Sequence, residues 1–149
     1  MLEKLAELHK LCFPNKPWAA EEFASLQKSG AEIIASEHGF IVWRCAADEC
    51  EIITIGVHPE HRGNGIGGAL LGLMEKEIKK NNHPAGFAGT LPKEGNPCGV
   101  KIFLEVASDN TFAIKLYEKH GYKKIATRPN YYESKNVGRT DALVMGKSL

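Results

Sequence analysis

A glycine-rich turn between an apolar stretch and an amphipathic helix limits the fold of this chain more than any other feature. The turn, residues 62–68, reads Arg-Gly-Asn-Gly-Ile-Gly-Gly and follows the β-type stretch Glu51–Val57. After it, apolar side chains recur at the 3.6-residue period of a helix face, at Ile66, Ala69, Leu70, Leu73, Met74 and Ile78. This order predicts an anion site, because the first amides of a helix lack intrahelical partners and glycine lets a ligand approach the backbone. Arg62 adds a fixed positive charge that suits phosphate oxygens.

The rest of the sequence alternates helix-like and strand-like stretches. Two helices are expected over Leu2–Leu11 and Trp18–Gln27, and another after the N-cap residue Asn110. The strands are expected at 31–36, 40–46, 51–57, 102–106, 122–127 and 141–145, and longer loops at 81–99 and 128–140. This order predicts a single domain over residues 1–149 of the mixed α/β class, with one mixed, mostly antiparallel sheet and helices on both of its faces.

Composition and charge exclude several classes of protein. With 19 basic and 18 acidic residues among 149, the formal net charge is +1, too balanced for a protein that binds nucleic acid through its phosphates. No apolar run reaches the roughly 18–20 residues of a membrane span, and the N-terminus does not resemble a secretory signal. We therefore expect a cytoplasmic protein with neither a nucleic-acid nor a membrane partner.

The cysteines and histidines predict no metal site. The four cysteines, Cys12, Cys45, Cys50 and Cys98, form no C-x-x-C pair, and the six histidines neither cluster nor show the spacing of metal ligands. In a reducing cytoplasm we expect the cysteines to be free thiols rather than disulfides.

Two common phosphate-binding patterns do not fit the glycine turn. Gly63, Gly65 and Gly68 match the dinucleotide fingerprint G-x-G-x-x-G, which follows its strand directly and needs an acidic residue about 20 positions later. Here residues 58–62 intervene, and the later position holds the loop 83–86, which has no acidic residue. A P-loop is excluded because no Lys-Ser or Lys-Thr pair follows the glycines.

Read as R-x-x-G-x-G, Arg62, Gly65 and Gly67 resemble the acetyl-CoA pyrophosphate motif of GCN5-related N-acetyltransferases, the GNAT family. Later segments are similar to that family in order and spacing, at 104–106, 110, 113, 116–118 and 121–122. Segments 128–132 and 138–142, with Phe13-Pro14, Pro17-Trp18 and Phe23, look like the bacterial enzymes that acetylate the N-terminal alanine of a ribosomal protein, the RimI type. The resemblance covers nearly the whole chain.

The resemblance implies a fold, a reaction and its residues. The strands Ile53–Val57 and Ile102–Val106 would be parallel and splayed, with acetyl-CoA between them as cosubstrate. Glu105 would act as general base and Tyr117 as the general acid that protonates the coenzyme thiolate. The coenzyme would contact Ile55, Val57, Arg62, Gly63, Asn64, Gly65, Ile66, Gly67, Gly68 and Asn110. Trp18, Tyr131 and Tyr132 would contact the acceptor, a protein or peptide N-terminus such as that of a ribosomal protein beginning with alanine.

Physical arguments bear on these roles but leave alternatives open. A carboxylate in the apolar run Ile102–Val106 costs several kcal/mol unless partnered, so Glu105 is either a functional residue or one that faces water. For Tyr117 and the pair Tyr131–Tyr132 the alternative role is packing, and for Asn110 it is helix capping. An α-amine, with a pKa of about 7.7–8.0, loses its proton more easily than a lysine amine near 10.4, which mildly favours an N-terminal acceptor. Acetylation of a lysine or a small-molecule amine stays open, as does an acyl-CoA-binding module without turnover.

Overall fold

The computed structural model describes residues 1–81, 99–134 and 138–149, with only the backbone for residues 132–134, 138 and 139. The elements are α1 (Leu2–Cys12), α2 (Ala20–Lys28), β1 (Ala31–Ala35), β2 (Gly39–Ala46), β3 (Glu49–Val57), the short 3₁₀ helix η1 (Pro59–His61), α3 (Ile66–Asn81), β4 (Lys101–Ala107), α4 (Thr111–Lys119), β5 (Lys123–Ser134) and β6 (Gly138–Ser148). Their order agrees with the prediction. Most of the expected 81–99 loop, with Cys98, lies outside the described residues.

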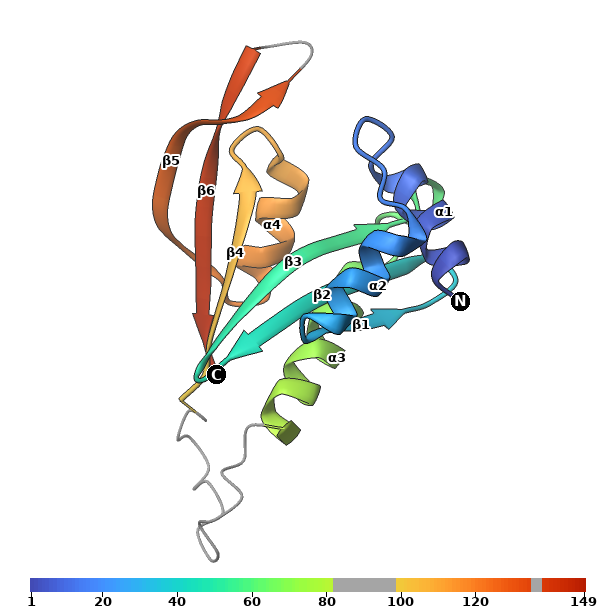
Figure 1. Ribbon diagram of the computed structural model, residues 1–149. Coiled ribbons are helices and arrows are strands. Elements are labelled where there is room, and N and C mark those ends of the chain that lie inside the picture. Colours follow the sequence, from blue (N-terminus) through green and yellow to red (C-terminus); the bar gives the residue numbers. More distant parts are fainter. Residues whose placement is uncertain (82–98, 135–137) are drawn as a thin grey trace, which may run out of the picture.

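The strands form one six-stranded sheet in the order β1-β2-β3-β4-β6-β5. All neighbouring pairs are antiparallel except β3 and β4, which are parallel and pair at only three positions, Glu49–Lys101, Cys50–Ile102 and Glu51–Phe103. Beyond Glu51 the two strands diverge (Figure 1). The mixed sheet and its splayed parallel pair are therefore confirmed. The splay divides the sheet into two halves, β1–β2–β3 and β4–β6–β5.

Helices cover the two halves differently. α1 and α2 lie on one face of β1–β3 and α3 on the other, while α4 lies on the α3 face beside β4 (Figure 1). Because side chains alternate along a strand, Phe40 packs under α1 and α2, whereas its neighbour Ile41 packs with α3. Along β4, Leu104 and Val106 belong to the α3–α4 core, so Glu105 projects from the opposite face. In the described ranges no helix is long and apolar enough to span a membrane.

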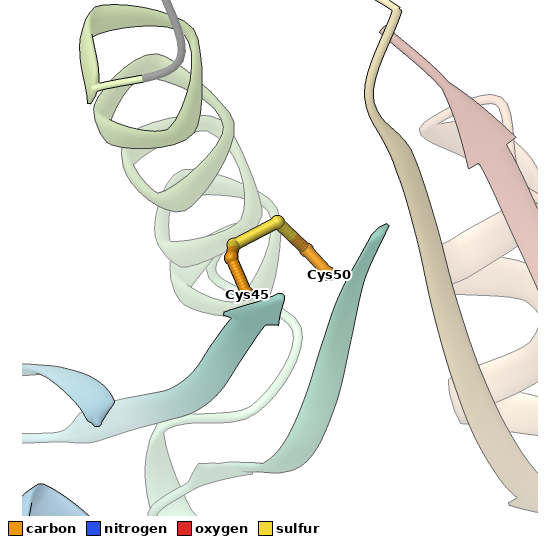
Figure 2. Close-up of a disulfide and its surroundings, with 2 residues drawn as sticks. All are labelled: Cys45 and Cys50. Atoms are coloured by element: carbon orange, nitrogen blue, oxygen red, sulfur yellow. A yellow bond between two sulfur atoms is a disulfide. The ribbon is translucent and has the colours of Figure 1, made fainter. Parts of the chain in front are cut away.

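A disulfide joins two of the cysteines. Cys45 and Cys50 stand directly opposite each other in the β2–β3 hairpin, and their side chains are bonded (Figure 2). The expectation of free thiols is therefore wrong for this pair, while Cys12 is a free cysteine as predicted. The reason is the register of the hairpin, which places these two cysteines opposite each other. Their spacing in the sequence does not indicate this pairing.

The last two strands are longer than the sequence predicts. The expected loop 128–140 is mostly strand, since β5 continues to Ser134 and β6 begins at Gly138. The register shifts between Arg128 and Tyr132, where Asn130 has a φ of 55° and donates its backbone N–H to the Asp141 carboxylate at 2.9 Å. This bulge lets the β5–β6 pairing resume after Pro129, a residue that cannot donate a ladder hydrogen bond.

Candidate active site

The splay between β3 and β4 opens a cavity of about 720 Å³. Its walls are residues 52–57 of β3, residues 104–107 of β4 and one side of α4, with Cys12 and Phe13 at the end of α1. Several predicted site residues meet there: Ile55, Val57, Arg62, Gly67, Glu105, Asn110 and Tyr117. Diverging strands leave main-chain groups without ladder partners, so this cavity offers peptide N–H and C=O groups to a ligand.

The backbone of β3 directs two amides into this gap. The His58 N–H donates to the His38 carbonyl at 2.8 Å, on the β2 side of β3. Because amide directions alternate along a strand, the N–H groups of Val57 and Ile55 point the other way, toward the side from which β4 has diverged. Contact of these two amides with the pantetheine arm and the thioester stays a prediction.

The glycine turn begins α3 with open amides. Gly63 and Gly65 have positive φ values of 82° and 78°, which glycine adopts without strain. The Gly65 carbonyl accepts the first helical hydrogen bond, from Ala69 at 3.0 Å, so the amides of residues 66–68 have no partner within the helix. The Asn64 side-chain amide donates to the His61 carbonyl at 3.3 Å and braces the turn. An anion could bind at these amides.

Three residues that the sequence assigns to the coenzyme have packing roles in the structure. A Cβ on Gly67 would lie 2.9 Å from Leu116, and one on Gly68 would lie 2.6 Å from His120. These glycines therefore allow α3 to approach α4 closely. Ile66 packs against the α3–α4 core. Gly67 also lines the cavity, and contact of all three with the coenzyme stays a prediction.

Arg62 lines the cavity and is exposed. Its Nε donates to the Val57 carbonyl at 3.1 Å, which ties the glycine turn to the end of β3. The guanidinium also lies beside the Cys12 thiol. Burial raises the pKa of this thiol, and the Arg62 charge and hydrogen bond oppose the rise. The sequence gives no reason to place Cys12 here; only the packing of α1 does so.

Glu105 is held by an ion pair that sequence reasoning missed. Arg128 Nη1 lies 3.0 Å from Glu105 Oε1, and the two side chains are 55% and 27% exposed. Glu105 lies opposite Val144 of β6, and Arg128 lies opposite Ala142, so the pair reaches across β6. The carboxylate is therefore half-buried, partnered and in the wall of the cavity, which accounts for its presence in an apolar strand.

The wall opposite β3 comes from α4. Tyr117 is 5% exposed and lines the cavity, and its ring centroid lies 6.0 Å from that of Tyr122. Tyr122 donates to Glu75 at 3.2 Å, and burial raises the Tyr122 pKa far above its usual range, so this second phenol stays protonated. Asn110 caps α4 through Oδ1, which accepts from the Ala113 N–H at 3.2 Å, and it also lines the cavity. The predicted capping role is confirmed.

Two of the predicted acceptor residues, Trp18 and Tyr131, lie outside the wall of the cavity. Trp18 stacks on the buried His9, with ring centroids 4.7 Å apart. Tyr131 is 53% exposed on β5, where its ring lies 5.4 Å from the Arg128 guanidinium carbon. Tyr132 pairs with Thr140 through the backbone, and its side chain is outside the described part of the chain. Phe13, which was not predicted as a site residue, does line the cavity.

Three histidines that are dispersed in the sequence come together beside η1. The rings of His38 and His61 stack with centroids 3.7 Å apart, and His58 lies 5.2 Å from His61. The expectation that the histidines do not cluster is wrong here, because the β1–β2 turn packs against η1. Among the described residues, no group of three or more His, Cys, Asp or Glu side chains is arranged to hold a metal ion.

Comparison with known families decides the class of this site. The model of the acetyltransferase (GNAT) domain matches residues 18–124. The chain belongs to the GNAT family. It is therefore an N-acetyltransferase, and its cavity is lined by residues of β3, β4 and α4 together with Arg62 and Gly67.

One relative and two solved structures are similar to most of this chain. The ribosomal protein bS18-alanine N-acetyltransferase of Escherichia coli (strain K12) is 31% identical over 134 residues, which cover 87% of this chain and 79% of that protein. The crystal structure of the ribosomal-protein-S18-alanine N-acetyltransferase from Escherichia coli has a TM-score of 0.78 at 26% identity, over 99% of this chain and 86% of that chain. Arabidopsis thaliana Naa50, in complex with the bisubstrate analogue CoA-Ac-MVNAL, has a TM-score of 0.72 at 26% identity, over 99% and 92%.

Proposed function

We propose that this GNAT enzyme transfers an acetyl group from acetyl-CoA to the N-terminal α-amine of a protein. The observation that carries the proposal is the cavity at the β3–β4 splay. It brings Val57, Glu105 and Tyr117 into the lining of one cavity, although these residues come from three separate elements.

Acetyl-CoA, the cosubstrate, matches the groups in and beside this cavity. Its pyrophosphate would bind the open amides at the start of α3 and the Arg62 charge, since a helix N-terminus favours an anion. Its pantetheine arm would follow the outward amides of β3, and the Asn110 side chain would lie alongside. This order brings the thioester to the cavity, where Glu105 and Tyr117 lie.

The chemistry is direct transfer. Glu105 accepts one proton from the neutral α-amine as the amine nitrogen forms a bond to the thioester carbonyl carbon. The Val57 N–H stabilises the negative charge that develops on the carbonyl oxygen. The carbon–sulfur bond then breaks, and the Tyr117 hydroxyl protonates the departing thiolate. The products are an N-acetyl amide and coenzyme A.

The relatives support a peptide N-terminus as the acceptor. The Escherichia coli relative is named for alanine of ribosomal protein bS18, and the Naa50 complex holds an analogue that joins coenzyme A to a peptide. We therefore propose the N-terminus of a ribosomal protein beginning with alanine as the substrate. Two side chains would contact the peptide. One is the exposed Tyr131, whose ring lies beside the Arg128 guanidinium, and the other is Phe13 in the cavity wall.

The test is a matched set of acceptors. One peptide has a free N-terminal alanine and no lysine, a second has the same sequence with a blocked N-terminus and one internal lysine, and a third acceptor is a polyamine. Release of coenzyme A and the mass of the product are measured for each. We expect turnover with the first only. Turnover confined to the lysine peptide or the polyamine would assign a different acceptor, and uptake of acetyl-CoA without turnover of any would indicate a binding module.

A further inference from the structure

We propose that Arg128 is a positioning residue that holds Glu105 in place for proton abstraction and links it to the acceptor-binding hairpin of β5 and β6. This inference rests on the proposed function, in which Glu105 is the general base. Arg128 is not part of the cavity wall, so its effect would be exerted through Glu105.

The geometry of the ion pair supports this role. Glu105 is 27% exposed and its side chain has several rotatable bonds, so without a partner its carboxylate could turn toward water. Arg128 Nη1 lies 3.0 Å from one oxygen of this carboxylate, Oε1. In the proposed arrangement the other oxygen, Oε2, receives the proton from the acceptor amine. A base held within a fraction of an ångström of its productive position is worth far more than one that samples several rotamers.

A bulge in β5 directly follows Arg128. Asn130 has a positive φ of 55° and its N–H is bonded to Asp141, so the strand turns locally between Arg128 and Tyr132. On one side of this turn Arg128 reaches across β6 to Glu105. Its guanidinium carbon also lies 5.4 Å from the centre of the Tyr131 ring, within cation–π range. One guanidinium therefore contacts both the base and a proposed acceptor residue.

This contact has a consequence for the reaction. A peptide that packs on the Tyr131 ring restricts the guanidinium, and the guanidinium restricts the Glu105 carboxylate. We expect the base to be best placed when a peptide occupies the hairpin, so that small amines, which cannot reach Tyr131, lose this effect.

The experiment is a double-mutant cycle between Arg128→Gln and Glu105→Gln, with kcat and KM measured for the N-terminal peptide. Arg128→Gln should lower kcat by about tenfold to 100-fold, the range expected for a misplaced reacting group, while the acetyl-CoA dissociation constant changes less than about twofold. Arg128→Lys should restore part of kcat, because a single nitrogen makes the ion pair. Lys124→Gln removes one positive charge from exposed β5 and is the control; it should leave kcat unchanged. Thermal unfolding of each variant verifies the fold.

The cycle separates this inference from the proposed function. In the Glu105→Gln background, Arg128→Gln should change kcat by less than about twofold, since its partner is gone. An equal loss of kcat in both backgrounds, or a rise in peptide KM with unchanged kcat, would overturn the positioning role and leave the proposed function standing. Glu105→Gln with wild-type kcat would instead remove Glu105 as the base, and this inference with it.

Discussion

The two halves of the sheet, on either side of the β3–β4 splay, differ in how completely helices cover their faces. β1–β3 are covered by α1 and α2 on one face and α3 on the other, and Phe23, Phe40 and Val42 there are 0% exposed. β4–β6–β5 carry α4 on one face (Figure 1), and on the other face the Arg128–Glu105 pair and Tyr131 are partly exposed.

This difference indicates that the two halves of the sheet have different roles. The covered half supplies rigid strands and the glycine turn, which present backbone amides, and such groups need no side-chain motion to bind a ligand. The open half supplies ionisable side chains, which need access to an acceptor and to water. We therefore expect substitutions in the covered half to change the free energy of unfolding or coenzyme affinity, and substitutions in the open half to change turnover.

The largest expected effect is loss of core packing in the covered half. Phe23→Ala should lower the free energy of unfolding by about 3–5 kcal/mol, because the ring is 0% exposed and its removal leaves a cavity. Urea unfolding measures this change. Phe112→Ala is the matched control in the open half, where the ring is 63% exposed, and it should cost less than about 1 kcal/mol. Equal losses from the two variants would contradict the comparison.

The next effect concerns the glycine turn. Gly65→Glu should weaken acetyl-CoA binding at least about 100-fold, because it places a negative charge among the amides proposed to hold the pyrophosphate. Gly65→Gln is the control, since it brings the same size and the same strain at a φ of 78° without the charge. Calorimetric titration with acetyl-CoA should show a much smaller loss for Gln. Similar losses for both would mean that backbone strain, and not the anion site, governs binding.

Reduction of the disulfide should lower the free energy of unfolding by an intermediate amount. It closes the β2–β3 hairpin at Cys50, which pairs with Ile102 at the junction of the two halves. For cysteines only 5 positions apart, the chain-entropy account predicts a loss of about 2 kcal/mol on reduction. Urea unfolding with and without a dithiol reductant measures it. The stability of a variant with alanine at both positions should not change with the reductant. A change in that variant would mean that the reductant does not act through this disulfide.

The smallest effect is a pH dependence of the covered half. Burial lowers the pKa of His9, and the charge of Glu22 opposes this shift. His9 Nδ1 accepts a hydrogen bond from the backbone N–H of Trp18 at 3.1 Å. Because the unfolded chain takes up this proton at a higher pH than the folded chain, the stabilisation is complete above pH 6.5 and is lost as pH falls. The loss should be about 1.4 kcal/mol for each unit between the two pKa values. His9→Asn should have a shallower slope between pH 7 and 5; an unchanged slope would exclude His9 as its source.

Much of the candidate site follows from local patterns. The glycine turn, the helix after it and the cap at Asn110 depend on neighbouring residues, so their spacing in the sequence predicts them. The role of Glu105 is suggested by a carboxylate in an apolar strand. Trp18 shows the limit of such reasoning: no local pattern predicts that it stacks on His9, a partner 9 positions away in the preceding helix. Its contact with the acceptor, which the resemblance implies, stays a prediction.

The sequence by itself determined the order of helices and strands and the glycine turn before α3, because these depend on periodicity and on residues close together along the chain. The resemblance of its motifs indicated the family. Tertiary structure alone decided the Arg128 partner of Glu105, the Cys45–Cys50 bond, the histidine stack and the entry of Cys12 and Phe13 into the cavity wall. Each of these depends on strand register or on the packing of distant elements. A one-residue shift of register turns a side chain to the other face, and no local pattern specifies that choice.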